Sequence, residues 1–149
     1  MTRFRYAVLS DIHSNLTALV AVMNELDRLG PYDDILCMGD ITGYGSNPNE
    51  CIMIVEKSRA RAIRGNHDRA VCGGDSDRFN SLAREAARYN ASVLMPESRK
   101  FLERLSPEPY VSELFAMAHG SFNFDPENTY IFENADAAEA LVCMTSSLG

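Results

Sequence analysis

The chain has 149 residues, of which 46% are hydrophobic and 23% charged, the composition of an ordinary globular protein, so we expect one domain over residues 1–149. Its 14 Lys and Arg against 21 Asp and Glu give a net charge of −7, which argues against broad electrostatic binding to nucleic acid or to an anionic membrane. The apolar runs are too short to cross a bilayer, no secretory signal is recognisable and the four cysteines form no C-x-x-C pair, so we expect a cytoplasmic protein with free thiols.

The first part of the chain alternates short apolar runs, typical of buried strands, with apolar residues at helical spacing. The helix over 16–29 follows Ser14 or Asn15 as N-cap and stops at Gly30-Pro31. The predicted elements are a strand over 5–10, that helix, a strand over 35–38, a helix over 48–59 and a strand over 61–64, which ends at the turn signal Gly65-Asn66. This order predicts right-handed βαβ units and a parallel sheet, and therefore an α/β fold.

The second part of the chain is predicted to be mainly helical. A helix over 77–95 carries a partly apolar face, and a shorter helix follows over 96–105. One or two strands are expected over 110–118, and a weak alanine-rich helix over 134–141. Residues 143–149 show no clear pattern.

The three histidines and one aspartate share a position in this scheme. His13, His67 and His119 each lie just past the carboxyl end of a predicted strand, and Asp40 follows the second strand in the same way. Each residue alone has an ordinary explanation as a turn residue, and Asp68 could cap a helix that starts at the next residue. In an open α/β sheet, however, ligands bind outside the carboxyl ends of the strands, so we expect these loops to converge on one site.

The residue types in these loops suit a divalent metal. Carboxylate, imidazole and amide oxygen ligands favour Mn²⁺, Fe²⁺ or Zn²⁺, and no thiolate is present to form a structural zinc site. Asp11 and His13, two apart on a segment expected to be extended, would point to the same side and bind one ion. Asp40 could bridge two ions, and two ions roughly 3.5–4 Å apart clamp the attacking and leaving oxygens of a phosphoryl transfer.

Four short segments resemble, in order and spacing, the first four motifs of the calcineurin-like metallophosphoesterases. They are Asp11-Ile12-His13, Gly39-Asp40, Gly65-Asn66-His67-Asp68 and Ala118-His119-Gly120. The flanking residues 10–16 and 39–45 are similar to the short prokaryotic phosphodiesterase and phosphatase branch, and the resemblance extends from residue 5 to about residue 141. It implies the fold of that family, β-sheets flanked by helices, here shortened at the C-terminus.

The resemblance also implies roles for individual residues. Asp11 and His13 would bind the first metal, Asp40 would bridge, and Asn66 and His119 would bind the second. The expected cofactors are two divalent ions, for which manganese, iron, zinc and nickel are candidates, and the expected nucleophile is a metal-activated water.

The resemblance assigns the catalytic contacts with the phosphate mainly to one histidine. His67 would act as proton donor or charge stabiliser, with Asp68 orienting it. Asn66 and His67 are candidate contacts with the substrate. Arg64 belongs to a small basic cluster that is most simply a solvated face, but it flanks the site and is a further candidate contact with the phosphate.

The sequence departs from the family pattern in two places. Protein Ser/Thr phosphatases of the family carry an Arg in the loop after Gly-Asp, whereas this loop reads Gly43-Tyr44-Gly45. A small phosphodiester or phosphomonoester is therefore the expected substrate, with no membrane partner and with nucleic acid only as a phosphodiester substrate. The usual C-terminal Gly-His-x-His motif is absent from the 149 residues. This leaves three alternatives: a truncated or frame-shifted reading frame, a degenerate member, or ligands from solvent or another chain. The missing strands would leave an open sheet edge, which predicts a homodimer.

Three functions are compared on this basis. The first is a dinuclear-metal hydrolase of phosphate esters, and the second is a degenerate relative that binds metal or phosphate as a regulatory subunit. The third, a nucleotide-binding module, is disfavoured because no G-x-G-x-x-G motif or P-loop follows the first strand.

Overall fold

A three-stranded parallel sheet forms the first half of the protein. The computed structural model describes residues 3–123 and 125–147. The strands β1 (Tyr6–Leu9), β2 (Asp34–Cys37) and β3 (Arg61–Ala62) lie in the order β1-β2-β3. Tyr6 pairs with Asp34 and Leu36 with Arg61, both in parallel register, as the order of the predicted elements requires. The predicted parallel α/β sheet is confirmed.

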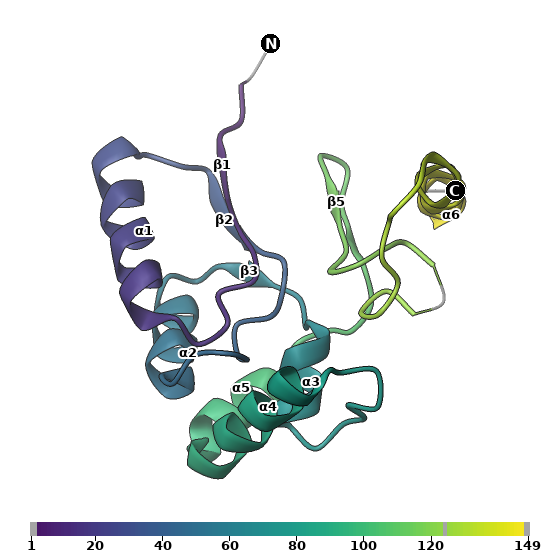
Figure 1. Cartoon of the computed structure of the whole chain (residues 1–149). Coiled ribbons are helices and arrows are strands. Elements are labelled where there is room, and N and C mark those ends of the chain that lie inside the picture. Colours follow the sequence, from purple (N-terminus) through teal and green to yellow (C-terminus); the bar gives the residue numbers. More distant parts are fainter. Residues whose placement is uncertain (1–2, 124, 148–149) are drawn as a thin grey trace.

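The two faces of this sheet are covered differently. Helices α1 (Leu16–Leu29) and α2 (Pro48–Lys57) lie on one face, and the antiparallel hairpin of β4 (Tyr110–Val111) and β5 (Ala116–Met117) stands on the other (Figure 1). Successive residues of a strand point to opposite faces, so Cys37 belongs to the large core on the helical side while Leu36 packs with Ile63 and Met117 on the hairpin side. The central strand β2 is thus covered on both sides, as parallel strands usually are, whereas Val8 of the edge strand β1 is exposed.

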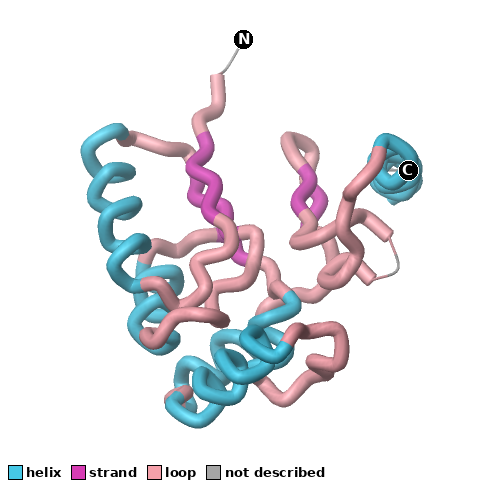
Figure 2. The backbone as a smooth tube through the Cα atoms, viewed as in Figure 1, coloured by secondary structure: helices cyan, strands magenta, loops and turns pink. Residues whose placement is uncertain are grey.

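The remaining helices gather near the carboxyl ends of the strands or stand apart from the sheet. Helices α3 (Asn66–Val71), α4 (Ser81–Val93) and α5 (Pro96–Arg104) pack together below the sheet, and α6 (Asn134–Ser147) lies beyond the hairpin (Figure 1). Figure 2 shows that long loops fill the space where the parallel strands end. None of the helices within the described part of the chain is long and apolar enough to cross a membrane.

Several predicted boundaries are wrong by a few residues, and the sequence predicts α3 only as an alternative, with its start at residue 69. Helix α4 begins at Ser81 and not at residue 77 as predicted. The side chain of Asn80 caps it by accepting a hydrogen bond from the Ala83 amide at 2.9 Å. The last helix continues to residue 147 instead of ending at 141. The Gly65-Asn66 pair, interpreted as a turn, is the start of α3, with Gly65 as its N-cap.

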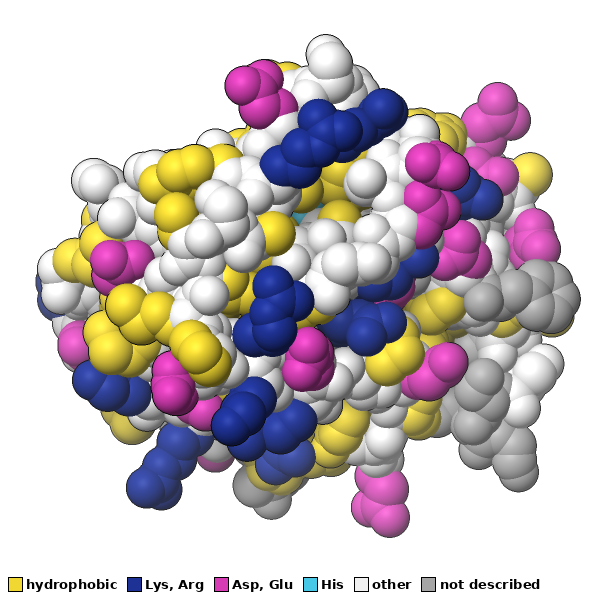
Figure 3. Space-filling view, turned by 90° about the horizontal axis from the view of Figure 1, so that it is seen from below, with side chains coloured by type: hydrophobic (Ala, Val, Ile, Leu, Met, Phe, Trp, Pro, Cys, Tyr) yellow, Lys and Arg dark blue, Asp and Glu magenta, His cyan; other side chains and the backbone are white. Residues whose placement is uncertain are grey.

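Charged side chains of both signs occur on the face of the molecule drawn in Figure 3. On the face drawn in Figure 3, Lys and Arg side chains are interspersed with Asp and Glu, so no single sign of charge dominates it. Cys37, Cys51 and Cys72 form no disulfide, as expected. Burial raises the pKa of the Cys37 thiol to about 12 and that of Cys51 to about 11, which makes both thiols poor nucleophiles.

Candidate metal centre

The predicted site residues converge where the strands end. Asp11 and His13 follow β1, Asp40 follows β2, and Asn66 and His67 stand in the first turn of α3, directly after β3. His119 follows β5, so it reaches the same place from the antiparallel hairpin and not from the parallel sheet. Convergence of these loops was therefore predicted correctly, although one of them belongs to a different sheet.

The loops are held in an unusual backbone conformation. Asp11, His13, Ser14 and Asp40 have φ values of 53°, 48°, 57° and 53°, a left-handed region that costs non-glycine residues free energy and is concentrated at functional sites. The expectation that Asp11 and His13 lie on an extended segment is therefore wrong. The His13 and Ser14 amides instead donate to the carbonyls of Asp40 and Ile41, both at 2.9 Å, which turns the first loop toward the second.

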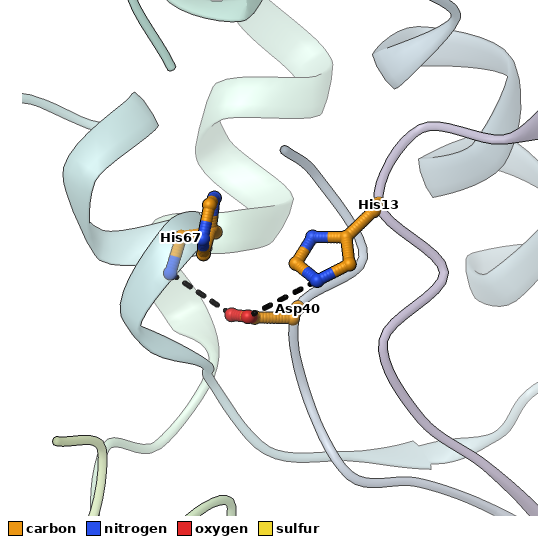
Figure 4. Close-up of side chains that lie close together, drawn as sticks. All are labelled: His13, Asp40 and His67. Atoms are coloured by element: carbon orange, nitrogen blue, oxygen red, sulfur yellow. Dashed lines mark hydrogen bonds and ion pairs between the residues drawn. The ribbon is translucent and has the colours of Figure 1, made fainter. Parts of the chain in front are cut away.

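The carboxylate of Asp40 lies at the centre of the cluster. Its Oδ2 is 3.7 Å from Nε2 of His13, and its Oδ1 accepts a hydrogen bond from the His67 amide at 2.9 Å (Figure 4). The same Oδ2 is 3.5 Å from Nε2 of His119. On the other side of His13, Nε2 is 3.5 Å from Oδ1 of Asp11. One carboxylate thus links groups from three separate loops.

Backbone carbonyl groups orient the rings of His13 and His119. Nδ1 of His13 is 3.1 Å from the Thr42 carbonyl, and Nδ1 of His119 is 2.8 Å from the Met38 carbonyl. A carbonyl oxygen only accepts, so each Nδ1 carries a proton, and Nε2 is the ring atom that faces Asp40. Orientation of metal-binding histidines by such contacts is common in proteins.

Oxygen acceptors therefore converge on the Nε2 atoms of His119 and His13. Nε2 of His119 faces both Oδ2 of Asp40 and Oδ1 of Asn66, the latter at 3.1 Å. Nε2 of His13 faces the carboxylates of Asp11 and Asp40. Each of these two places requires a proton or a cation, and the donor set of carboxylate, imidazole and amide oxygen fits a divalent metal.

The pKa shifts of the clustered side chains reflect the same need for a proton or a cation between them. Burial, reinforced by the nearby Asp68, raises the pKa of Asp40 to about 7, against the opposing pull of His119. The hydrogen bond with His13 outweighs burial and lowers the pKa of Asp11 to about 2. Burial alone would lower the pKa of His13, but the carboxylates of Asp11 and Asp40 raise it.

His67 has a different environment from the other two histidines. Its ring stacks on Phe79, with centroids 4.3 Å apart, and lies 4.7 Å from the His13 ring. Burial, together with the nearby His13 and His119, lowers its pKa to about 4. Its Nδ1 is buried and has no hydrogen-bond partner among the described residues. His13, Asp40 and His67 can each offer a ligand atom, all within 4.8 Å of one another.

Asp68 does not occupy the position that the resemblance implied. Its fully buried carboxylate accepts from the amides of Ile41, Thr42 and Gly65 at 3.3, 2.9 and 3.1 Å and from the Thr42 hydroxyl at 2.9 Å. No hydrogen bond between Asp68 and the His67 ring is found in the described part of the chain. Asp68 fixes the loop that carries Asp40, and burial raises its pKa against these hydrogen bonds.

The Arg64 side chain is already paired. Its Nε is 2.6 Å from Oε1 of the buried Glu127, and Arg69 approaches Oε2 of the same carboxylate at 3.3 Å. The expected phosphate contact of Arg64 would require this pair to open. Glu127 gave no signal in the sequence, because a lone Glu in an irregular segment has no pattern.

Glycine is required at two positions of the site. A Cβ on Gly43, whose φ is +144°, would collide with the His13 ring and lie 3.0 Å from Nδ1 of His67. A Cβ on Gly65 would collide with the Asp40 carboxylate. The glycines beside the candidate ligands are thus explained by close approach of side chains to the backbone.

One buried residue of the site was missed. Asn90 of α4 accepts from the Ser14 hydroxyl at 2.5 Å and donates to the carbonyls of Gly43 and Gly45 at 2.7 and 3.0 Å. Its position on the apolar stripe with Ala83 and Ala87 was a signal, because a polar residue on a buried face needs partners.

Comparisons with known proteins agree with this geometry. A family model described as calcineurin-like phosphoesterase matches residues 4–142. A metallophosphoesterase from Sphaerobacter thermophilus is 35% identical with a TM-score of 0.79, and the match covers 95% of this chain and 57% of that one. A hypothetical protein from Pyrococcus horikoshii shares the fold at 20% identity and a TM-score of 0.76, over 97% of this chain and 66% of that one.

A curated relative adds sequence similarity. An uncharacterized protein from Methanocaldococcus jannaschii is 43% identical over 106 residues, which are 70% of this chain and 43% of the relative. The chain thus spans between 43% and 66% of the length of these three proteins. The match over residues 4–142 shows that the chain belongs to the calcineurin-like phosphoesterase family.

Proposed function

We propose that this protein is a dinuclear-metal hydrolase that cleaves a small phosphodiester or phosphomonoester. The observation that carries the proposal is the placement of Asp40 Oδ2 3.7 and 3.5 Å from the Nε2 atoms of two histidines whose Nδ1 atoms contact backbone carbonyls. Family membership supports metal-dependent phosphoester chemistry in general. The proposal adds three points to this general chemistry: the presence of two ions, Mn²⁺ as the metal, and a small substrate.

The residues divide into two candidate ligand groups that share one carboxylate. Asp11 and His13 would hold one ion, Asn66 and His119 the other, and Asp40 would contact both. When bound, the ions supply activation of an attacking water and neutralisation of charge on the phosphoryl oxygens. The side chains hold that charge in a fixed geometry because their loops are cross-linked by backbone hydrogen bonds.

His67 would contact the phosphate as a neutral ring. With a pKa of about 4 it carries no charge at neutral pH, so it stabilises a phosphoryl oxygen by donating one ring N–H and not by ion pairing. The stacked Phe79 fixes the plane of the imidazole. Tyr44 lies in the loop where the protein phosphatases of the family carry an Arg, and this loop brings no positive charge, which favours a small substrate over a phosphoprotein.

The proposal is tested by hydrolysis of bis-p-nitrophenyl phosphate in Mn²⁺. We expect turnover that is lost with chelator, and a decrease in kcat on the order of 100-fold or more in His67→Ala, because a positioned donor to the phosphate is removed. Glu25→Gln, which alters only an exposed pair with Arg28 on α1, serves as control and should match the parent. A folded, metal-loaded protein without turnover would contradict the proposal and favour a metal- or phosphate-binding subunit.

We also propose a homodimer that forms through the open edge of β1. Within the described residues β1 pairs only with β2, and Val8 on this strand is 62% exposed. An unpaired strand with exposed apolar side chains is a template for pairing with a second copy. Sedimentation velocity at micromolar concentration should show a dimer in the parent and a monomer in Val8→Lys. A parent that sediments only as a monomer would refute this proposal.

A further inference from the structure

A pocket of about 560 Å³ opens directly beside the metal centre. Its wall is made by residues 11–17 after β1 and residues 44–47 after β2. Asp11 and His13 belong both to this wall and to the candidate ligands, so a phosphate held at the centre would leave one substituent at the mouth of the pocket. The volume lies in the range of sites that enclose a small organic group.

The charges along the wall disfavour a second anionic group. The residues that line the pocket include no Lys or Arg, and Asp11 is the only acidic one. The first turn of α1 borders the pocket through Leu16 and Thr17, as does Asn47, the N-cap of α2, and the amino-terminal end of a helix favours oxygen acceptors. Glu50, in the first turn of α2, weakens that attraction for a full negative charge. The substituent that fits is uncharged and carries hydrogen-bond acceptors.

Hydrogen-bonding groups on the wall are available to such a ligand. The described structure contains no hydrogen bond from the Thr17 hydroxyl or from Nδ2 of Asn47, and both residues line the pocket. Among the described residues, Oδ1 of Asn47 accepts only from the neighbouring Ser46 hydroxyl, at 3.1 Å. Hydroxyl and amide donors of this kind suit carbonyl or sugar oxygens.

Tyr44 provides a flat apolar surface in the same wall. Its side chain is 47% exposed although Ile41, Thr42 and Gly43 before it are buried. The centroid of its ring lies 4.9 Å from that of His13 and 5.0 Å from that of His67. An exposed tyrosine is ordinary on a protein surface, but this ring is held against the two imidazoles that flank the phosphate position. A planar group attached to that phosphate would reach it.

We propose that this pocket binds the non-scissile substituent of a phosphodiester, and that this substituent is an uncharged, nucleoside-sized group whose ring stacks on Tyr44. The proposal rests on the proposed phosphoesterase function and names its substrate class. Any flat base can stack on an aromatic side chain. We therefore expect the pocket to distinguish substituents with a ring from substituents without one, and not one base from another.

The test compares two diesters with the same leaving group and the same charge. These are the p-nitrophenyl ester of thymidine 5′-monophosphate and methyl p-nitrophenyl phosphate. We expect kcat/KM to be on the order of tenfold higher for the thymidine ester, and Tyr44→Leu to remove that preference while Tyr44→Phe retains it. Tyr32→Leu, which removes a ring from the loop between α1 and β2, should keep the parent's ratio.

A third ester separates an uncharged ligand from an anionic one. Carboxyethyl p-nitrophenyl phosphate carries an additional negative charge, and we expect no gain in kcat/KM over the methyl ester. A preference for the carboxylate ester, or an unchanged ratio in Tyr44→Leu, would overturn the proposal. Because only the ratio between esters is scored, general damage to the metal centre by a substitution at Tyr44 lowers both rates and does not imitate the result.

Binding without turnover distinguishes this proposal from the proposed function. In ¹H–¹⁵N spectra of the chelated protein, thymidine should shift the amides of residues 15–17 and 44–47 in the parent and not in Tyr44→Leu. If no ester is hydrolysed but these shifts occur, the proposed function fails and the pocket assignment stands. If esters are hydrolysed without preference and thymidine causes no shifts, the function stands and the pocket assignment is wrong.

Discussion

Replacing Asp40 with Asn is expected to reduce turnover at least about 100-fold and, at the same time, to stabilise the metal-free protein. Asp40 is the carboxylate that faces both candidate metal positions, so its negative charge is needed by each. Asn is the least disruptive replacement because it tolerates the φ of 53° at this position. The loss of activity would therefore report the missing charge and not a broken loop.

The gain in stability follows from replacing a buried carboxylate by a neutral amide that can hydrogen-bond to the same neighbours. In Asp40→Asn, the amide oxygen can still accept from the His67 amide, and the new amide nitrogen can donate toward Nε2 of His13 or His119. The metal-free parent instead buries a carboxylate, and burial together with Asp68 raises its pKa from 3.8 to about 7. We expect the substitution to stabilise the chelated protein at pH 8 by about 2 kcal/mol.

The pH dependence of this difference has a defined sign. The folded pKa of about 7 lies above the reference value of 3.8, so folded protein binds more protons than unfolded protein between these values. The stability of the chelated parent then falls as the pH rises from about 4 to about 7, whereas Asp40→Asn lacks this contribution. Urea unfolding in EDTA should show nearly equal stabilities near pH 4 and the full difference at pH 8. A variant that is less stable than the parent at pH 8 would contradict this account.

The order of secondary structure and the position of the site were predictable from the sequence for one reason. Buried parallel strands are short apolar runs, and the polar residue that ends each run also begins a loop at the carboxyl edge of the sheet. Asp11 and Asp40 were placed correctly by this argument, whereas His119 reaches the site from the antiparallel hairpin. It needs only local patterns, and the order of the elements then determines a parallel sheet.

The conformation of the loops could not be predicted because it depends on residues far apart in the chain. Asp11 and His13 adopt positive φ because the amides of this segment pair with carbonyls of residues 39–41. Helix α3 begins at Asn66 because the amides of Gly65 and His67 find acceptors in Asp68 and Asp40. A local signal such as Gly65-Asn66 is compatible with a turn or an N-cap, and only the distant carboxylate decides between them.

A second large effect is expected at Asn90, which does not touch the metal position. Its side chain joins α4 to the loop that carries Asp11 and His13 and to the loop that carries Asp40. Its Oδ1 accepts from the Ser14 hydroxyl at 2.5 Å and the Gly43 amide at 3.3 Å, and its Nδ2 donates to the Gly43 and Gly45 carbonyls. Ser14 adjoins His13 and has a φ of 57°, so the hydrogen bond helps to hold a strained segment in place.

Asn90→Ala should therefore lower both stability and activity. Removing a fully buried partner leaves the Ser14 hydroxyl and the groups of Gly43 unsatisfied, which we expect to cost about 2–4 kcal/mol. The loosened loops should also lower kcat about 10- to 100-fold under conditions where the protein stays folded, as loss of supporting contacts around metal ligands does in other proteins. Urea unfolding and initial rates with bis-p-nitrophenyl phosphate provide the two measurements.

Asn49 offers a matched control, because its amide bridges helices without touching the loops. Its Nδ2 donates to the Val93 carbonyl at 2.9 Å, and its Oδ1 accepts from the Met95 amide at 2.8 Å. Asn49→Ala should lower stability by about 1–2 kcal/mol and leave kcat and the apparent Mn²⁺ affinity unchanged. If Asn90→Ala behaved in the same way, Asn90 would have only a structural role.

The coupling between Asn90 and Ser14 separates positioning from a general loss of packing. Ser14→Ala removes one of the hydrogen bonds of Asn90 and should lower kcat less than Asn90→Ala does. If the two residues act through the same contact, the double variant should lose less activity than the product of the two single losses, because the second substitution removes an interaction that is already gone. Independent losses would mean that Asn90 acts on the site through the second loop alone, by way of Gly43 and Gly45.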